Sequence, residues 1–224
     1  MISKLGLIFE CDAGGPDELV FKCLVKRLTP MTEVIVRTLG NKPAVFERGA
    51  SVAQTLVELD NCDLVLIVWD LKPPLDSPAS CMSEADRLRA SISGIPSTIK
   101  CKIKLLCLTY ELEAWLLADD SAVRKYLSKP THPCKWRLRG SPDSFDDAKA
   151  VLIGVFRDFR GLRYEDFREA IKIASRWTTT AKLRRIHSFG YFVELLTGSP
   201  ASEFQQDGSV CADLCHSGSM MGRN

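Results

Sequence analysis

The run Asp63-Leu-Val-Leu-Ile-Val-Trp-Asp70 is apolar between two acidic residues. A continuous apolar run of this length predicts a central strand that is buried on both faces, which is typical of a parallel sheet. Shorter runs rich in apolar or β-branched residues predict three further strands. We expect these strands at residues 5–9, 32–39 and 103–108.

Segments with helical periodicity lie between these strands. Residues 17–28 carry an apolar stripe and follow Pro16, a residue suited to the first turn of a helix. We expect Ser51 and Ser83 to cap the next two helices, and a further helix to begin at Glu111. The alternation of strands and helices predicts a doubly wound α/β fold, in which helices flank a parallel sheet.

The character of the sequence changes after residue 127. Residues 1–127 are expected to form the α/β domain, and residues 128–197 a basic, Pro-rich loop and a helical extension of the same domain. The helices of this extension are expected at about residues 145–156, 164–176 and 180–196. Residues 198–224 are rich in Gly and Ser, so we expect a flexible tail there.

The overall composition excludes a disordered chain, because 46% of the 224 residues are hydrophobic and 26% are charged. The net charge is only +2, so any attraction to nucleic acid must come from a local basic patch. No run approaches the roughly 18 apolar residues of a membrane span. Glu10 also interrupts the first apolar run before it reaches the length of a signal-peptide core. We therefore expect a cytoplasmic protein without a membrane segment.

The nine cysteines are scattered and odd in number, a pattern that does not suggest a disulfide framework. Four of them lie in apolar or element-forming stretches and are expected to be reduced thiols. These four are Cys23, Cys62, Cys101 and Cys107. Only Cys211, Cys215 and His216 cluster, and this spacing without a second pair of ligands is a weak zinc pattern.

Acidic residues follow three of the predicted strands. Glu10 ends the first strand, Asp70 ends the third, and the fourth runs into Glu111 and Glu113. In an open α/β sheet, ligands bind beyond the carboxyl ends of the strands. Carboxylates gathered at that edge would repel one another unless a cation lay between them, and oxygen ligands suit Mg²⁺ or Mn²⁺. The alternative is that each acid caps a helix or faces solvent.

Several of these residues fall in stretches that resemble Toprim domains, a Rossmann-like fold of topoisomerases, primases and OLD-family nucleases. Leu7-Ile-Phe-Glu10, followed by Asp17-Glu18 and an apolar helix, is similar to the first Toprim motif. Val68-Trp-Asp70-Leu-Lys72 stands where Toprim domains have a strand that ends in Asp-x-Asp. The most specific stretch is Glu111-Leu-Glu113-Ala-Trp-Leu-Leu-Ala-Asp119, which resembles a segment of a small Toprim-like family of unknown function. Ser188-Phe189 also resembles that family.

The resemblance implies a divalent-metal-dependent phosphodiesterase, in particular a DNA or RNA nuclease of a phage-defence system with an ATPase partner. The implied catalytic residues are Glu10, Asp70 and Glu113. The implied ligands of Mg²⁺ or Mn²⁺ are Glu10, Asp70, Glu18, Glu111 and Glu113. The metal would polarise a phosphodiester and lower the pKa of the attacking water.

Lys72 departs from the Toprim pattern, because it replaces the second acid of Asp-x-Asp. The exchange changes the local charge by about two units and should weaken binding of a second divalent ion. Lys72 could instead contact a phosphate, and Asp76 could take the place of the missing acid. Cys11 and Asp12 also stand where Toprim domains usually have Gly. A chain that has lost the metal chemistry would be a nucleic-acid or protein binding module, which is the alternative function.

Two stretches combine basic and aromatic residues, as nucleic-acid binding surfaces do. The first comprises Lys129, Lys135, Trp136, Arg137 and Arg139, to which Lys72 adds a phosphate contact. The second comprises Arg176, Trp177, Lys182, Arg184 and Arg185. The simpler alternative is that these charges are only solvated. No strand is followed by GxxxxGK[ST] or GxGxxG, so nucleotide binding by those motifs is not expected. A third function that the sequence leaves open is hydrolysis of small phosphoesters.

Overall fold

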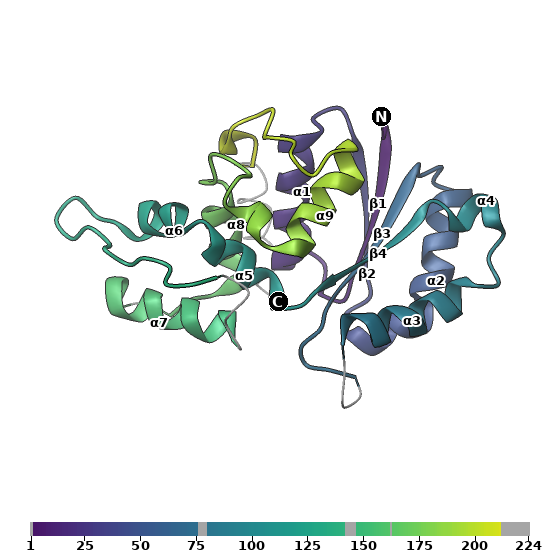
Figure 1. Ribbon diagram of the computed structural model, residues 1–224, viewed down its shortest axis with the longest axis horizontal. Coiled ribbons are helices and arrows are strands. Elements are labelled where there is room, and N and C mark those ends of the chain that lie inside the picture. Colours follow the sequence, from purple (N-terminus) through teal and green to yellow (C-terminus); the bar gives the residue numbers. More distant parts are fainter. Residues whose placement is uncertain (1, 76–79, 142–146, 162, 212–224) are drawn as a thin grey trace, which may run out of the picture. The chain divides into compact units, whose positions relative to one another are not determined.

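The computed structural model describes residues 2–75, 80–141, 147–161 and 163–211 (Figure 1). The chain divides into two compact units. The sheet unit comprises Met1–Ala13 and Met31–Thr109, and the helical unit comprises Gly14–Pro30 and Tyr110–Asn224. This division differs from the expected boundaries at residues 127 and 197. Helix α1 (Pro16–Leu28) belongs to the helical unit because it packs on two of the helices near the C-terminus.

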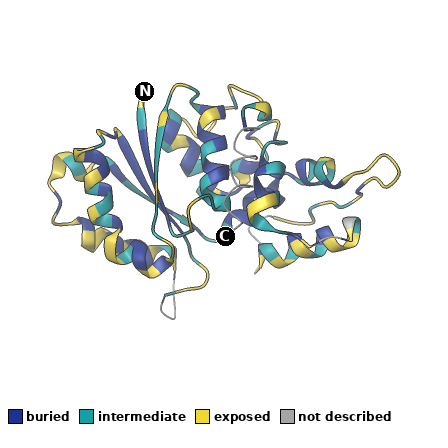
Figure 2. Cartoon of the chain, turned by 180° about the vertical axis from the view of Figure 1, so that it is seen from behind, coloured by how far each residue is buried: buried dark blue, intermediate teal, exposed yellow. Residues whose placement is uncertain are grey.

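The sheet unit is built on four parallel strands in the order β2-β1-β3-β4. The strands are β1 (Lys4–Phe9), β2 (Glu33–Thr38), β3 (Leu64–Asp70) and β4 (Ile103–Leu108). The predicted α/β class with a parallel sheet is thus confirmed. Every residue of β3 up to Trp69 is buried, as the apolar run predicts (Figure 2).

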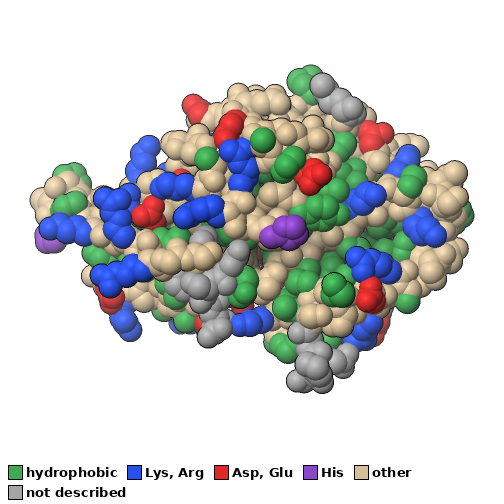
Figure 3. Space-filling model, viewed as in Figure 1, with side chains coloured by type: hydrophobic (Ala, Val, Ile, Leu, Met, Phe, Trp, Pro, Cys, Tyr) green, Lys and Arg blue, Asp and Glu red, His purple; other side chains and the backbone are tan. Residues whose placement is uncertain are grey.

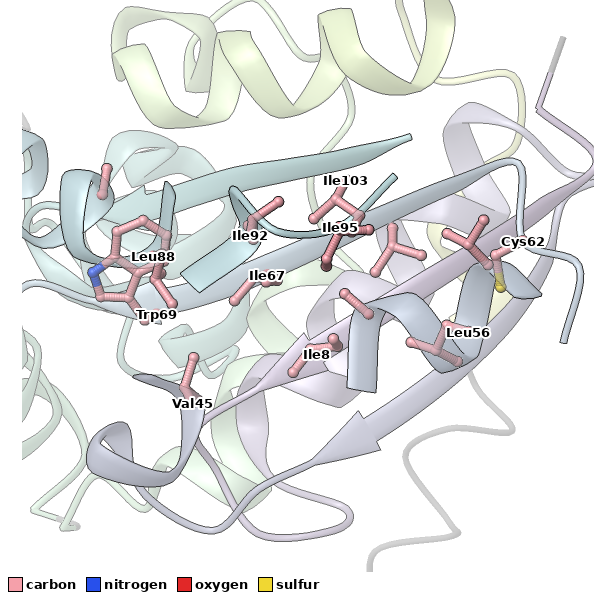
Figure 4. Packing of buried hydrophobic residues seen from close by; sticks show 14 residues of the cluster. Ile8, Val45, Leu56, Cys62, Ile67, Trp69, Leu88, Ile92, Ile95 and Ile103 are labelled. Carbon is pink, nitrogen blue, oxygen red and sulfur yellow. The ribbon is translucent and has the colours of Figure 1, made fainter. Parts of the chain in front are cut away.

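Helices α2 (Lys42–Glu58), α3 (Cys81–Ile92) and α4 (Ser97–Lys100) connect the strands of this unit. Their apolar side chains form one core with those of the sheet (Figure 4). From the sheet it contains Ile8, Val65, Ile67, Trp69 and Ile103, and from the helices Val45, Leu56, Leu88 and Ile92. Because successive strand residues face opposite sides, these alternate residues mark the face of the sheet that the helices cover.

The expected starts of two helices are wrong. Helix α2 begins at Lys42, where the Asn41 side chain accepts a hydrogen bond from the backbone of Ala44 and Pro43 occupies the first turn. Ser51 lies within this helix. Helix α3 is capped by Ser80, and Ser83 completes a capping box with it instead of forming the cap.

The helical unit contains six α-helices and two short 3₁₀ segments among the described residues. After α1 come α5 (Glu111–Ala118), α6 (Asp120–Leu127), α7 (Ala148–Arg160), α8 (Asp166–Ala174), η2 (Leu183–Arg185), α9 (His187–Thr197) and η3 (Gly208–Cys211). Helix α6 was not expected; Asp119 caps it. The helix predicted over residues 180–196 is divided, because extended backbone at Ile186 separates η2 from α9.

Two disulfides correct the expectation of reduced thiols. Cys23 is bonded to Cys211, and Cys107 to Cys81. The other two expected thiols are free, Cys62 buried and Cys101 exposed. Since Cys211 is in a disulfide, it is not available to a zinc ion. Cys215 and His216 lie outside the described residues.

The segment from Ser202 to Cys211, part of the expected tail, has specific contacts with the helical unit. Glu203 accepts hydrogen bonds from Thr179 and the backbone of Thr180 and forms an ion pair with Arg184. The disulfide at Cys211 adds a covalent link to α1. Within the described part of the chain, no helix is long and apolar enough to cross a membrane. The cytoplasmic location stays a prediction.

Candidate active site

Glu10 and Asp70 lie at the carboxyl ends of β1 and β3, the two central strands of the sheet. From β1 the chain continues to β2 on one side, and from β3 it continues to β4 on the other side. The adjacent ends of β1 and β3 are therefore the topological switch point, where open α/β sheets bind ligands. The Glu10 Oε1 atom accepts a hydrogen bond of 3.0 Å from the backbone N–H of Asp70. The structure thus brings together two of the predicted acids, both partly exposed.

The loop after β3 is held by a buried ion pair that the sequence analysis missed. The Lys42 ammonium lies 2.8 Å from Glu84 and donates hydrogen bonds to the carbonyls of Leu71 (2.8 Å) and Pro73 (3.0 Å). The Glu84 carboxylate accepts further hydrogen bonds from the Trp69 indole and from the backbone of Leu75. Both ends of the loop 71–75 are therefore fixed to the first turns of α2 and α3.

Lys72 lies in this loop, and its side chain is exposed. Lys42 and Glu84 fix the backbone of residues 71–75, so the position of Lys72 beside the end of β3 is defined. Asp76, the expected substitute for the missing Toprim acid, lies outside the described residues.

The other three predicted ligands, Glu18, Glu111 and Glu113, belong to the helical unit. Both carboxylate oxygens of Glu18 have partners within α1 and the turn before it. One accepts from the backbone of Gly14 at 2.8 Å and the other pairs with Lys22 at 2.5 Å. In the structure Glu18 therefore has a local capping role, the alternative considered for each acid.

Glu111 begins α5 with φ of 62°, in the left-handed region that non-glycine residues seldom adopt. Such a conformation costs about 1–3 kcal/mol and is often found at functional sites. The carboxylate of Glu111 also acts on its neighbour, since its charge contributes to a raised pKa of Glu113.

Glu113 is a buried acid of the helical unit. Burial raises its pKa to about 7, although the charge of Lys149 opposes that shift. The Tyr164 hydroxyl donates a 3.3 Å hydrogen bond to its Oε1, and the Lys149 ammonium lies 4.0 Å away. Lys149 is bound more closely by Asp166, at 2.6 Å. A carboxyl whose pKa lies near neutral pH can both give and take a proton, which is the property of a general acid or base.

No group of three or more His, Cys, Asp or Glu side chains that could hold a metal ion occurs among the described residues. Mg²⁺ does not need such a group, because proteins commonly bind it through one or two carboxylates while waters and substrate phosphates complete the octahedron. The two acidic side chains at the switch point, Glu10 and Asp70, match that donor set.

All residues of the first basic stretch except Lys129 line a cavity of about 440 Å³. Its walls are Lys135, Trp136, Arg137, Arg139, Val151 and Phe159. Three cations and two aromatic rings thus share one hollow, and none of the described residues that line it is acidic. Figure 3 shows Lys and Arg side chains gathered over α6 and the loop that follows it. The backbone of Trp136 is fixed by Arg124, which donates to its carbonyl oxygen.

The second basic stretch is used mainly for contacts within the protein. Lys182 bridges Asp119 and Asp120, with 2.9 Å to each. Arg184 pairs with Glu203, and Arg185 donates to the carbonyl of Ala118. These cations bind other parts of the helical unit, so this stretch is a weaker candidate for a nucleic-acid surface.

The structure also joins two distant stretches that resemble the small Toprim-like family, residues 111–119 and Ser188-Phe189. The Trp115 indole donates a 3.0 Å hydrogen bond to Ser188, and its ring packs edge-on against Phe189. A scan against protein-family models found no match, and searches of curated proteins and of solved structures likewise found none. The Toprim-like relationship therefore stays a prediction.

Proposed function

We propose that the chain is a divalent-metal-dependent phosphodiesterase that acts on DNA or RNA, with its metal site at Glu10 and Asp70. The observation that carries the proposal is the hydrogen bond between Glu10 and the backbone of Asp70 at the switch point of the sheet. It holds the Glu10 carboxylate beside the backbone of Asp70, so that two acidic residues lie where ligands of α/β sheets bind. Bound there, Mg²⁺ or Mn²⁺ would lower the pKa of a water molecule and stabilise charge on a phosphate.

The chain's own residues supply orientation and charge. The backbone N–H of Asp70 holds the Glu10 carboxylate, so that group is oriented before substrate arrives. Lys72 follows on a loop that the buried Lys42–Glu84 pair fixes, and its ammonium is suited to a substrate phosphate. The resemblance adds Glu113 as a third catalytic residue and an ATPase as partner, and both remain predictions.

The proposal is tested by incubating the purified protein with supercoiled plasmid, single-stranded DNA and structured RNA, each in Mg²⁺, Mn²⁺ or EDTA. We expect cleavage that needs the metal and is lost in Glu10→Gln and Asp70→Asn. Glu47→Gln is the matched control, because Glu47 is an exposed carboxylate of α2 in the same unit. Cleavage that persists in both site variants would refute the assignment.

A second function is favoured by the basic cavity and by Lys72 at the metal site, namely a binding module without metal chemistry. The cavity of Lys135, Trp136, Arg137 and Arg139 offers charges for phosphates and a ring for base stacking. This module would bind single-stranded nucleic acid in EDTA, and Arg137→Ala with Arg139→Ala would weaken that binding. If the wild-type protein cleaves none of the substrates but binds single-stranded nucleic acid in EDTA, the binding module is favoured over the enzyme.

A further inference from the structure

Strand β2 forms one edge of the sheet, and β1 is the strand that pairs with it among the described residues. The backbone N–H of Glu33 donates to the carbonyl of Ser3 on the β1 side. Because the backbone of a strand alternates in direction, the N–H and C=O groups of Val34 and Val36 point away from β1. Such an outward row of backbone groups is a template on which a further strand can be added.

The composition of β2 favours addition of a strand. Val34, Ile35 and Val36 are β-branched and only partly buried, and the strand contains no proline. The carbonyl of Val36 accepts a 3.1 Å hydrogen bond from the guanidinium of the next residue, Arg37. Since Arg37 is exposed, the N–H of an incoming strand can replace its side chain at that carbonyl.

The sequence Glu33-Val-Ile-Val-Arg37 is complementary to itself when two copies run antiparallel. With Ile35 on the two-fold axis, Val34 lies opposite the partner's Val36, and Glu33 lies opposite the partner's Arg37. Opposed residues of an antiparallel pair point to the same face of the sheet, within about 4.5–5.5 Å between Cβ atoms. Each end of the paired strands therefore carries two opposite charges, and the positions between them pair valine with valine.

The same register also satisfies the backbone. Val34 and Val36 both present outward N–H and C=O groups, so each Val34–Val36 pair exchanges two hydrogen bonds, about four in total. The Glu33–Arg37 pairs then fall at the positions without backbone hydrogen bonds, where opposed side chains lie closest. A register changed by one residue would oppose an outward residue to an inward one. A register changed by two residues would place Glu33 opposite the uncharged Ile35 or Leu39.

Both charged side chains of β2 have surface to offer a partner. The Glu33 side chain is 61% exposed and pairs with Lys4 at 3.2 Å, and the Arg37 side chain is 46% exposed and pairs with Asp60 at 3.1 Å. Exposed ion pairs of this kind contribute little to stability, so exchanging them costs little. The opposite edge strand, β4, has no such match, because Lys104 is its only charged residue.

We infer that β2 is the interface of a homodimer, in which two copies of the chain pair antiparallel around Ile35. Pairing would join the two four-stranded sheets into one continuous sheet. Its two-fold symmetry is that of most soluble homodimers. One strand pair is a small interface, below about 1,200 Å², so the dimer should dissociate on dilution. The inference does not depend on the proposed phosphodiesterase activity.

Sedimentation velocity of the whole chain from about 10 μM to about 1 mM tests the inference. We expect the wild type to change from monomer to dimer over this range. Glu33→Lys and Arg37→Glu should each raise the dissociation constant by about tenfold or more, because each opposes like charges at both ends of the strand pair. Glu47→Lys makes the same charge change as Glu33→Lys at an exposed position of α2 and should dimerise as the wild type does.

Mixing the two variants gives the decisive measurement. A mixed pair of Glu33→Lys and Arg37→Glu chains has opposite charges at both ends again, so the mixture should dimerise although each variant alone does not. Mixing does not restore the ion pairs with Lys4 and Asp60 within each chain, so recovery cannot come from them. The double variant Glu33→Lys with Arg37→Glu should likewise dimerise.

Three results would overturn the inference. The first is a wild type that stays monomeric up to about 1 mM. The second is a dimer that both single variants form as tightly as the wild type, which would place the interface elsewhere. The third is a mixture of the two variants that stays monomeric. Circular dichroism first shows that each variant is folded, and if one single variant is not, the double variant decides.

Discussion

Glu113→Gln should make the protein more stable at alkaline pH and leave it nearly unchanged at acidic pH. Burial raises the pKa of Glu113 from its ordinary 4.5 to about 7. The folded state therefore binds the carboxyl proton more tightly than the unfolded state does. The stability that this proton contributes is fully present below pH 4.5 and is lost as the pH rises through about 7. Glutamine keeps the shape and an acceptor for Tyr164 but carries no charge.

The size of the effect follows from linkage between proton binding and folding. Each pKa unit corresponds to about 1.4 kcal/mol, so the full shift at Glu113 is worth about 3 kcal/mol. Part of this stability is already lost at pH 5. Between pH 5 and pH 8 the difference in free energy of unfolding between Glu113→Gln and wild type should therefore change by about 2–3 kcal/mol. Tyr164 does not contribute to this change. Burial raises its pKa well above 10, so its hydroxyl keeps its proton between pH 5 and pH 8.

The assay is urea denaturation in EDTA at a series of pH values, with the free energy of unfolding extrapolated to water. The quantity compared is the difference between Glu113→Gln and wild type at each pH, so that groups shared by both proteins cancel. Glu194→Gln makes the same chemical change at an exposed position of α9 and should show no trend. A difference for Glu113→Gln that stays constant from pH 5 to pH 8 would refute the reasoning.

Two further perturbations test other parts of the structure. Lys42→Met leaves the buried carboxylate of Glu84 without its cation, so the free energy of unfolding by urea should fall by about 3 kcal/mol. A loss below about 1 kcal/mol would contradict a stabilising role of the Lys42–Glu84 ion pair. In Gly208→Ala the new methyl would lie 1.5 Å from the carbonyl oxygen of Ser175, so limited proteolysis should cut residues 198–211 faster. Gly94→Ala, which has open space around its Cβ, should leave the rate unchanged; equal rates in all three proteins would show that residue 208 does not pack on α8.

The parallel sheet was predictable because its signals are local. The run from Asp63 to Asp70 is apolar at every position between its ends, and burial on both faces is the condition that allows such a run. The start of α2 was missed because Ser51, a good cap by type, lies where the backbone is already helical. The pattern Asn41-Lys-Pro43 carried the correct signal, since an Asn cap with Pro in the first turn marks a helix start.

The candidate site was predictable only in part. Acids at strand ends identified Glu10 and Asp70, because parallel strands end at the same edge of the sheet. The partners of Glu113 and the buried pair of Lys42 could not be found in this way. They come from segments far apart in sequence, such as Tyr164 for Glu113, and no periodicity connects such residues. The disulfides were missed for the same reason, since pairing depends on distance in the fold.

The central claim is that Glu10 and Asp70 hold a divalent cation, and titration with Mn²⁺ tests it most directly. Electron paramagnetic resonance detects free Mn²⁺, so binding appears as a loss of signal when protein is added. We expect the wild type and Glu47→Gln to remove Mn²⁺ from solution, and excess Mg²⁺ to release it. Glu10→Gln and Asp70→Asn should each abolish that binding. No uptake by the wild type, or equal uptake by both site variants, would contradict the account.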